Sequence, residues 1–538
     1  MSEHLVLAAL AGAARWVDPA LHDHVAGRTR PLSDLLAAGV GKAGSVPAGR
    51  DGQARVGILM PNSASWYEAL FAAMAAGAMA IPLPLPAGFV GPQAYVEHVL
   101  LIAETARLDA VLVHGAAMTP TLKRIRQRAP GVEFVDIAEC PVTDVAPAPA
   151  DADRPCVVQF TSGSTGRPKG VVLTQANVVA ALEILRDQLF LTPTDRLGSW
   201  LPLFHDMGLF MTLTAFASGA GVELWAPSEA VRRPLRWLEQ FAAAGCTTLA
   251  APNFFYEALA TAVAEADEPP AADLRGWRFA LNGAETVRAE SVRRFTEALA
   301  PLGFHPAALW PVYGLAEATL PGTLQEPGRP YAVRHVDRDR LAFGAPVAFR
   351  AGGPGARAVV ACGRPLRRTA LRIADGDREL PPGSLGEVQL HGPTITPGYL
   401  DLPPSAGPRT PTGWLRTGDL GFVQDGELFI TGRLKNMASV NGHNVHAEDV
   451  EDVVRSVLGG HVRCGAVAGV DDDGAESVRV VFETSAEGAD RAAEEKRVRE
   501  GIAHALGAIP VDVVGVLPRS IPHTSSGKVQ RQQLSLRA

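Results

Sequence analysis

The stretch "FTSGSTGRPKGVVLTQANV", residues 160–178, places glycines, hydroxyl side chains and one lysine between two apolar runs. When such a loop joins a strand to a helix, successive backbone N–H groups converge on an anion and the helix N-terminus adds its partial positive charge. We therefore expect this loop to hold a phosphate group. An ordinary glycine-rich connection would have the same composition, and the loop alone leaves that alternative open.

The spacing within the loop differs from that of the Walker A motif, G-x-x-x-x-G-K-[ST]. Counted from Gly163, Pro168 stands where the second glycine is required and Gly170 stands where the hydroxyl residue is required. The loop is therefore a phosphate-binding candidate of another kind.

The chain around this loop predicts an α/β fold. Through the first 320 residues, helix-length segments alternate with short apolar runs, which favours parallel sheets covered by helices; these runs lie at 56–60, 110–114, 132–137, 156–160, 221–226, 247–252 and 279–283. Closely spaced strand candidates with turn signals follow from about 358 to 432 and predict a small β-rich subdomain. We expect a large N-terminal domain over residues 1–433 and a small, mobile α+β lid domain over residues 434–538.

Composition narrows the functional class. The formal net charge of −7 argues against a nucleic-acid binder. The five cysteines lie far apart in the sequence, so we expect a reducing, cytoplasmic location. Gly77 and three prolines interrupt the apolar stretch 68–90, which predicts a buried helix and a short strand and no membrane span.

Further motifs follow the loop in a fixed order: "SWLPLFHDMGL" (199–209), "LNGAETV" (281–287), "YGLAEATL" (313–320), "WLRTGDLGF" (414–422), "GRLKNMASVNGHNVHAEDVE" (432–451) and "IPHTSSGKVQR" (521–531). Together with "TSGSTGRPKG", they resemble the acyl-adenylate-forming superfamily, and specifically its fatty acyl-AMP ligase branch, from about residue 50 to 538. The resemblance implies an enzyme that activates a fatty or related carboxylic acid with ATP and Mg²⁺ and releases pyrophosphate. The acyl group would then pass to the phosphopantetheine thiol of an acyl carrier protein.

Two alternatives stay open beside this interpretation. An acyl-CoA or aryl-CoA synthetase would use coenzyme A as the acceptor, and a catalytically silent regulator would bind an adenylate without reacting. Residues 334–366 lengthen the connection after "YGLAEAT". A similar insertion in fatty acyl-AMP ligases is held to disfavour transfer to coenzyme A, although this one could also do no more than cover a sheet edge.

The resemblance implies two groups of nucleotide-binding residues. The phosphates would contact the loop and Lys169, and Glu317, assisted by Thr165, would ligate Mg²⁺; the loop residues are Thr161, Ser162, Gly163, Ser164, Thr165 and Gly166. Tyr313 would stack on the adenine, and Asp419 and Arg433 would bind the ribose. The adenine pocket would be completed by Asn282, Gly283, Ala284, Glu285, Gly314, Leu315 and Ala316.

The resemblance also implies residues for the acid and for the change between half-reactions. His205 would lie beside the carboxylate as a gating and catalytic residue, with Trp200, Met211 and Phe255 lining the acyl pocket. The bulk of Met211 would shorten that pocket. Lys528 would bridge the carboxylate and the α-phosphate. Asn436 occupies the hinge position, where the family usually has Asp or Lys.

Overall fold

The computed structural model describes most of the chain: residues 4–86, 91–115, 119–149, 151–161, 168–353, 355–440, 443–459, 462–470, 476–507, 509–522 and 529–534. Ser162, Gly163, Ser164, Thr165, Gly166 and Lys528 lie outside the described residues. Within them, none of the helices has both the length and the apolar character needed to cross a bilayer.

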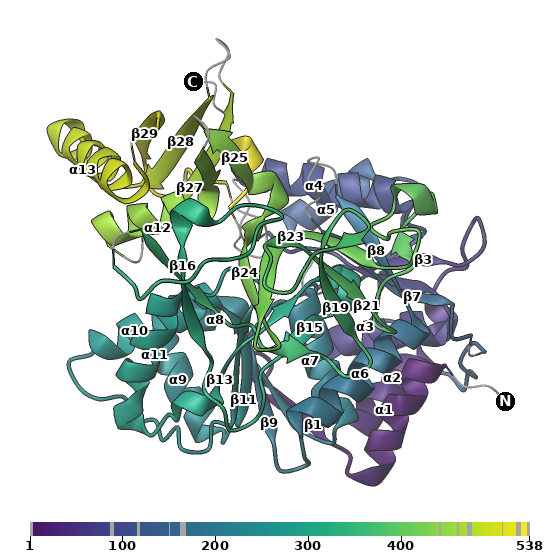
Figure 1. Ribbon diagram of the computed structural model, residues 1–538. Helices are drawn as coiled ribbons and strands as arrows, with labels where there is room; N and C mark the ends of the chain where they lie inside the picture. The colour runs from purple at the N-terminus through teal and green to yellow at the C-terminus, as the bar shows by residue number, and fades with distance from the viewer. Residues whose placement is uncertain are drawn as a thin grey trace.

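Two seven-stranded sheets organise the described part of the N-terminal 400 residues (Figure 1). The first runs in the order β13-β12-β11-β9-β10-β1-β2, with bounds Leu309–Pro311, Phe279–Gly283, Thr248–Pro252, Arg196–Ser199, Gly221–Leu224, Ala20–Asp23 and Arg28–Pro31. The second runs in the order β22-β8-β7-β4-β3-β5-β6, with bounds Gly398–Tyr399, Lys169–Thr174, Pro155–Thr161, Met79–Pro82, Arg55–Ile58, Ala110–Val113 and Glu133–Asp136. The alternation of apolar runs and helices had predicted this arrangement.

Most neighbouring strands in both sheets are parallel, and helices cover their faces. Side chains that alternate along one strand enter two different cores: Leu112 of β5 joins one, and Val111 and Val113 join the other. This double burial explains why β5 is an uninterrupted apolar run. The main core includes residues of α1, α2, α3, α6 and α7 (Leu5–Trp16, Leu32–Gly41, Ala64–Ala75, Gln175–Leu189 and Asp206–Ala217).

The remaining helices of this region lie on the outer faces. The second core joins the second sheet to α4 and α5 (Gly91–Ala106 and Pro120–Arg128). Near the first sheet lie α8, α9, α10 and α11 (Pro227–Arg232, Pro234–Ala243, Asn253–Ala264 and Ala289–Leu299), and the last three contribute aromatic side chains to the main core. The strand pair β1–β2 extends the first sheet by pairing β1 in parallel with β10.

A β-rich region follows, as the turn-rich sequence predicts. Its largest sheet has the order β20-β19-β21-β23-β24, with bounds Arg378–Glu379, Ala370–Asp375, Gly386–His391, Leu415–Gln424 and Glu427–Arg433. Smaller sheets are β14-β15-β18 (Tyr313–Gly314, Pro321–Leu324 and Arg364–Pro365) and β16-β17 (Val333–Asp337 and Ala356–Val360). The insertion expected at 334–366 therefore contains most of the antiparallel β16–β17 pair.

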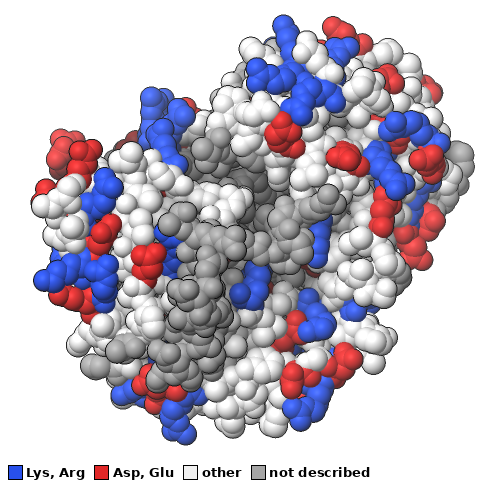
Figure 2. All heavy atoms as spheres, turned by 90° about the horizontal axis from the view of Figure 1, so that it is seen from above, with Lys and Arg blue, Asp and Glu red and all other residues white. Residues whose placement is uncertain are grey.

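Residues 437–534, which we call the C-terminal unit, have an apolar core of their own. The unit contains β25, β26, α12, β27, β28, α13 and β29 (Met437–Val440, His443–His446, Ala447–Leu458, Cys464–Val470, Glu476–Glu483, Gly488–Leu506 and Val511–Val516). In Figure 1 it stands above the rest of the molecule. Figure 2 views the molecule from that side and shows acidic and basic side chains interspersed over the surface.

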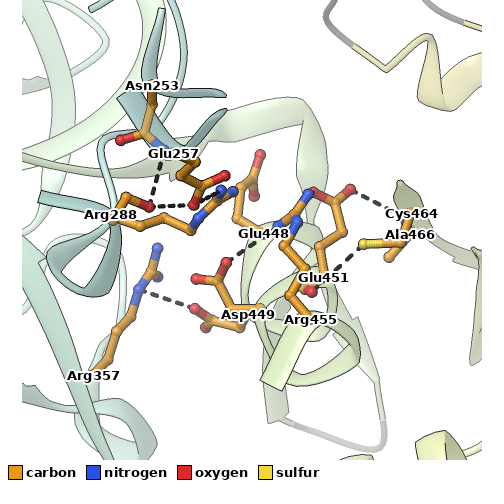
Figure 3. Close-up of polar contacts among 12 residues, drawn as sticks. Asn253, Glu257, Arg288, Arg357, Glu448, Asp449, Glu451, Arg455, Cys464 and Ala466 are labelled. Carbon is orange, nitrogen blue, oxygen red and sulfur yellow. Dashed lines mark hydrogen bonds and ion pairs between the residues drawn. The ribbon is translucent and has the colours of Figure 1, made fainter. Parts of the chain in front are cut away.

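An ion pair joins the C-terminal unit to the insertion (Figure 3). Arg357 of β17 places Nε 2.9 Å from Oδ1 of Asp449 on α12, and both residues are buried. Arg338 adds a hydrogen bond of 2.9 Å to the carbonyl oxygen of Ala505 on α13. The insertion therefore contacts two helices of the C-terminal unit and does more than cover a sheet edge.

Candidate active site

The expected adenine residues lie at the carboxyl ends of parallel strands. Asn282 and Gly283 end β12, and Tyr313 follows β13, which pairs with β12. In open α/β sheets this edge is where ligands bind. Strand order thus brings together residues that are separated by about 30 positions in the sequence.

Asp419 and Arg433 face each other across the β23–β24 pair. Arg433 Nε lies 2.7 Å from Oδ1 of Asp419, and the hydroxyl of Tyr313 donates to Oδ2 at 2.7 Å. Asp419 raises the pKa of Arg433, and burial, followed by the charge of Asp419, raises the pKa of Tyr313. The structure therefore brings three of the expected nucleotide residues into direct contact.

The Asp419 carboxylate retains capacity for a sugar. An ionised carboxylate accepts about four hydrogen bonds, and the described residues donate to each of its two oxygens once from a side chain. Two vicinal hydroxyl groups can therefore still donate to it. This arrangement fits a ribose.

Glu317 lies in the short turn η5 (Ala316–Ala318), close to Lys169 at the start of β8. The hydroxyl of Tyr399 donates to Glu317 Oε1 at 2.9 Å, and Lys169 Nζ lies 5.1 Å from the centroid of the Tyr399 ring. Burial raises the pKa of Glu317, while the Tyr399 hydroxyl and Arg433 act against that rise. An oppositely charged pair of side chains therefore meets at one tyrosine.

The "NGAE" segment has two different environments. The Oδ1 atom of Asn282 is buried and has no hydrogen-bond partner among the described residues, so it is open to a ligand donor. Ala284 has a φ of 65°, a strained conformation for a residue with a Cβ and one that recurs at ligand sites. Glu285 Oε1 instead accepts a hydrogen bond of 2.5 Å from the backbone N–H of Phe254. Its carboxylate is engaged by the first turn of α10.

The expected acyl-pocket residues are mostly apolar and buried. The rings of Trp200 and Phe255 have centroids 4.5 Å apart, and Met211 lies in the same core on α7. His205 is the N-cap residue of α7 and packs against the Phe204 ring at 4.4 Å. Asp206 follows at the first position of α7, and its charge raises the pKa of Glu317. The start of α7 is thus electrostatically coupled to Glu317.

The two ends of the phosphate loop are positioned by pairing of the strands that flank it. Thr161 ends β7 and pairs with Lys169, the first residue of β8. The five loop residues between them that were expected to bind phosphate are outside the described part of the chain. Gly314, Leu315 and Ala316 connect Tyr313 to Glu317, so the base-stacking and metal-binding candidates are adjacent along the chain.

Asn436 lies in the short turn η8 (Leu434–Asn436), directly before the C-terminal unit. Its side-chain amide donates a hydrogen bond of 2.8 Å to Oε1 of Glu448 on α12. Burial raises the pKa of Glu448. The candidate hinge residue therefore contacts the unit whose orientation it would control.

The donor atoms of the described residues show whether they could hold Mg²⁺. They contain no group of three or more His, Cys, Asp or Glu side chains that could hold a metal ion. Mg²⁺ commonly uses only one or two protein carboxylates and completes its octahedron with phosphate oxygens and water. Glu317 alone therefore fits an ion that arrives with a nucleotide.

The sequence motifs missed two residues of this site, Thr396 and Tyr399. The backbone N–H of Thr396 donates to the carbonyl oxygen of Glu317 at 2.8 Å, and Tyr399 contacts Glu317 and Lys169. Neither residue stands in a glycine-rich or charged pattern. Their separation of about 80 residues from Glu317 hides the contact from any local sequence signal.

Comparisons with known proteins indicate the family of this chain. Residues 46–400 match the family described as AMP-binding enzyme. The long-chain-fatty-acid–AMP ligase FadD26 of Mycobacterium marinum is 33% identical, with 89% of this chain and 86% of that protein covered. The putative fatty-acid–CoA ligase fadD25 of Mycobacterium tuberculosis is 32% identical, with 88% of this chain and 86% of that protein covered. A structure from a study of fatty acyl-adenylate ligases from E. coli and L. pneumophila has a TM-score of 0.87 and 27% identity, and covers 98% of this chain and 96% of that one.

Proposed function

The chain belongs to the AMP-binding enzyme family, in its fatty acyl-AMP ligase-like branch, and from this premise we propose that it converts a fatty or related carboxylic acid and ATP to an acyl-adenylate. The observation that carries the proposal is the contact of the Asp419 carboxylate with both Tyr313 and Arg433. A phenol ring, a carboxylate with spare acceptor sites and a guanidinium together suit a nucleoside.

In the proposed first half-reaction, a carboxylate oxygen of the acid attacks the α-phosphorus of ATP. A bond forms between that oxygen and phosphorus, the bond to the bridging oxygen of the β-phosphate breaks, and pyrophosphate leaves. Asp419 and Arg433 hold the ribose, and Lys169 and the phosphate loop hold the β- and γ-phosphates. Lys528 stabilises the charge that develops between the carboxylate and the α-phosphate. Glu317 would hold Mg²⁺, which when bound neutralises phosphate charge.

In the proposed second half-reaction, the sulfur of a phosphopantetheine arm on an acyl carrier protein attacks the acyl carbonyl carbon. A thioester forms, the bond from the acyl carbon to the AMP oxygen breaks, and the thiol proton passes to the surroundings. The C-terminal unit turns about Asn436 so that Lys528 leaves the cleft. The contacts of the insertion with Asp449 and Ala505 support the carrier protein as acceptor, because they tie the insertion to the unit that must move.

A second candidate function is transfer to coenzyme A. It is favoured by one observation, the likeness to a relative named as a putative fatty-acid–CoA ligase. The acceptor is the only difference between the two candidates.

The test measures pyrophosphate release over a panel of carboxylic acids, with holo-carrier protein and coenzyme A offered in parallel. We expect pyrophosphate release with a fatty acid and a thioester on the carrier protein. A thioester formed only on coenzyme A would favour the second candidate. Adenylate binding without pyrophosphate release for any acid would identify a silent regulator and would contradict both enzymatic proposals.

A further inference from the structure

Tyr399 lies between two charged side chains that come from different parts of the chain. Its hydroxyl donates to Glu317 Oε1 at 2.9 Å, and its ring centroid lies 5.1 Å from Lys169 Nζ. A lysine ammonium within about 6 Å of an aromatic ring is attracted by the negative face of the ring. One side chain thus contacts an anion through its hydroxyl and a cation through its ring.

Backbone hydrogen bonds determine where Tyr399 stands. Tyr399 pairs with Val171 in β8, the strand that begins at Lys169. Three residues earlier, the backbone N–H of Thr396 donates to the carbonyl oxygen of Glu317 at 2.8 Å, and its hydroxyl donates to the carbonyl oxygen of Val172 at 2.5 Å. The segment 396–399 is therefore joined both to the strand of Lys169 and to the turn of Glu317.

Without Tyr399, the ammonium of Lys169 and the carboxylate of Glu317 would be drawn together into a direct ion pair. Opposite charges at a partly buried site interact more strongly than in water, and Arg433 and Asp206 are the other charged groups whose influence reaches Glu317. Among the described residues, Lys169 has no carboxylate within ion-pair distance, and its ammonium contacts the Tyr399 ring. A direct Lys169–Glu317 pair would neutralise the two groups that a nucleotide and its metal ion require.

We propose that Tyr399 is a positioning residue that keeps Lys169 and Glu317 apart and oriented for ATP and Mg²⁺. The inference rests on the proposed function and deepens it at the phosphate end of the site. The hydrogen bond uses one carboxylate oxygen of Glu317, so the other can still ligate a cation. Metal-binding carboxylates are commonly oriented by such outer hydrogen bonds, and losing one typically costs about 10- to 100-fold in metal affinity.

The test compares ATP binding to the full chain by calorimetry, with and without Mg²⁺ and without any acid substrate. Tyr399→Phe keeps the ring and removes the hydroxyl. We expect Mg²⁺-free ATP affinity within about twofold of the unmodified protein and a roughly tenfold smaller gain in affinity on adding Mg²⁺. Tyr399→Leu removes the ring as well. Besides the smaller gain on adding Mg²⁺, we expect the affinity for ATP without Mg²⁺ to fall by about fivefold.

A nucleotide-free crystal structure of Tyr399→Leu gives a second readout. We expect Lys169 Nζ to move to within ion-pair distance of the Glu317 carboxylate. Tyr331→Phe is the matched control, because it removes the hydroxyl of a partly buried tyrosine that faces Thr296 on α11; it should change neither measurement.

Two outcomes would overturn the inference. One is a gain in ATP affinity on adding Mg²⁺ that is unchanged in Tyr399→Phe, and the other is a Tyr399→Leu structure in which Lys169 and Glu317 are still apart. Failure of the proposed function has a different signature. The unmodified protein would then release no pyrophosphate with any acid, while the nucleotide-free structure of Tyr399→Leu would still decide the role of Tyr399.

Discussion

Asp419 is a buried carboxylate, only 5% exposed, whose neighbours replace the water it has lost. Removing a carboxylate from water is costly unless hydrogen bonds and an opposite charge replace the lost hydration. The Tyr313 hydroxyl and the Arg433 guanidinium supply both. Under the proposed function, this carboxylate is held in place for ribose hydroxyls before any nucleotide arrives.

Asp419→Asn should weaken ATP binding, because it removes a charged acceptor and leaves Arg433 without its partner. Hydrogen bonds to charged groups contribute about 1.5–3 kcal/mol, so we expect the Kd for ATP to rise by roughly 10- to 100-fold. Calorimetric titration measures this. Asp425→Asn is the control, since Asp425 pairs with Arg334 at an exposed turn, where an ion pair contributes little. Equal losses in the two variants would contradict the assignment.

Lys528→Ala should abolish pyrophosphate release and leave acyl transfer from pre-made acyl-AMP largely intact. Losing one donor aimed at the reacting centre costs about 3–4 kcal/mol of transition-state stabilisation, or roughly 10²- to 10³-fold in rate. The two half-reactions are measured separately, with Lys496→Ala on the exposed face of α13 as control. Similar losses in both half-reactions would show that Lys528 does not act in adenylation alone.

At the residue scale, the motifs indicate which residue types the site would use, and they do not show which side chains contact one another. Asp419 and Arg433 were both expected near the ribose, and strand pairing does place them together. The side chain of Glu285, expected beside the adenine, accepts a hydrogen bond from the backbone of Phe254. Tyr399 was missed. The direction of a side chain depends on the packing of distant segments, which no motif contains.

At the element scale, α7 is a helix of the main core that carries Met211, a residue expected to line the acyl pocket. Its residues from Met207 to Phe216 are all buried. The hydroxyl of Thr212 donates to the carbonyl oxygens of Gly208 and Leu209, which satisfies it within the helix. A helix buried on all sides has no polar face, so changes in its side-chain bulk act on the space around it.

Met211→Ala should shift substrate preference toward longer acids. If Met211 limits the acyl pocket, truncating it opens space for further methylene groups, each contributing about 0.8 kcal/mol on burial. A series of saturated acids, read out by pyrophosphate release, measures the preference. The unmodified protein should favour medium chains, and a preference for C16 over C8 would count against this view of the pocket.

The same substitution leaves a cavity, so a stability cost is expected with it. Leu, Ile or Met to Ala in a core typically costs about 2–5 kcal/mol. Phe210→Leu, on the neighbouring position of α7, controls for loss of core volume. An identical shift in chain-length preference in that variant would assign the effect to general loosening of the helix.

The sequence predicted some of the strands and missed others. The continuous apolar runs at 110–114 and 279–283 match β5 and β12, because central strands are buried on both faces. The pair β1–β2 was not expected. Those strands lie at a sheet edge and carry several polar side chains, including His22 and Arg30. Edge strands need no such apolar run.

At the scale of the whole molecule, His446 lies at the junction between the C-terminal unit and the rest of the chain. It is 2% exposed, and neither ring nitrogen has a hydrogen-bond partner among the described residues. Burial and the positive charge of Arg357 lower its pKa from 6.5 to about 4, with Asp449 acting in the opposite direction. The folded protein therefore resists protonation of this ring.

His446→Phe should reduce the loss of stability in acid. Above pH 6.5 the ring is neutral in both states and contributes no pH dependence. Between pH 6.5 and about 4 the unfolded chain binds a proton that the folded chain does not, so the free energy of unfolding falls as the pH is lowered, by up to about 3 kcal/mol. His4, whose pKa is also lowered to about 4, adds a similar loss.

Denaturant unfolding followed from pH 7 to 4 measures the slope. The His446→Phe variant should show a smaller loss than the unmodified protein, because His4 and His98, whose pKa values burial also lowers, still contribute. The exposed His335→Gln should show the full loss. If His446→Phe followed the same pH dependence as the unmodified protein, the ring would have to be hydrated or protonated in the folded state.

The amino-acid sequence by itself determined the fold class, the order of the elements and the chemical types at the site. Those properties follow from local patterns: buried strands need apolar runs, and anion loops need glycine and hydroxyl residues. Only the tertiary structure decided that Tyr399 stands between Lys169 and Glu317, that Glu285 binds the backbone of α10, and that Arg357 reaches Asp449. Such contacts depend on sheet order and on which helix faces meet, and these are set by the packing of the whole chain.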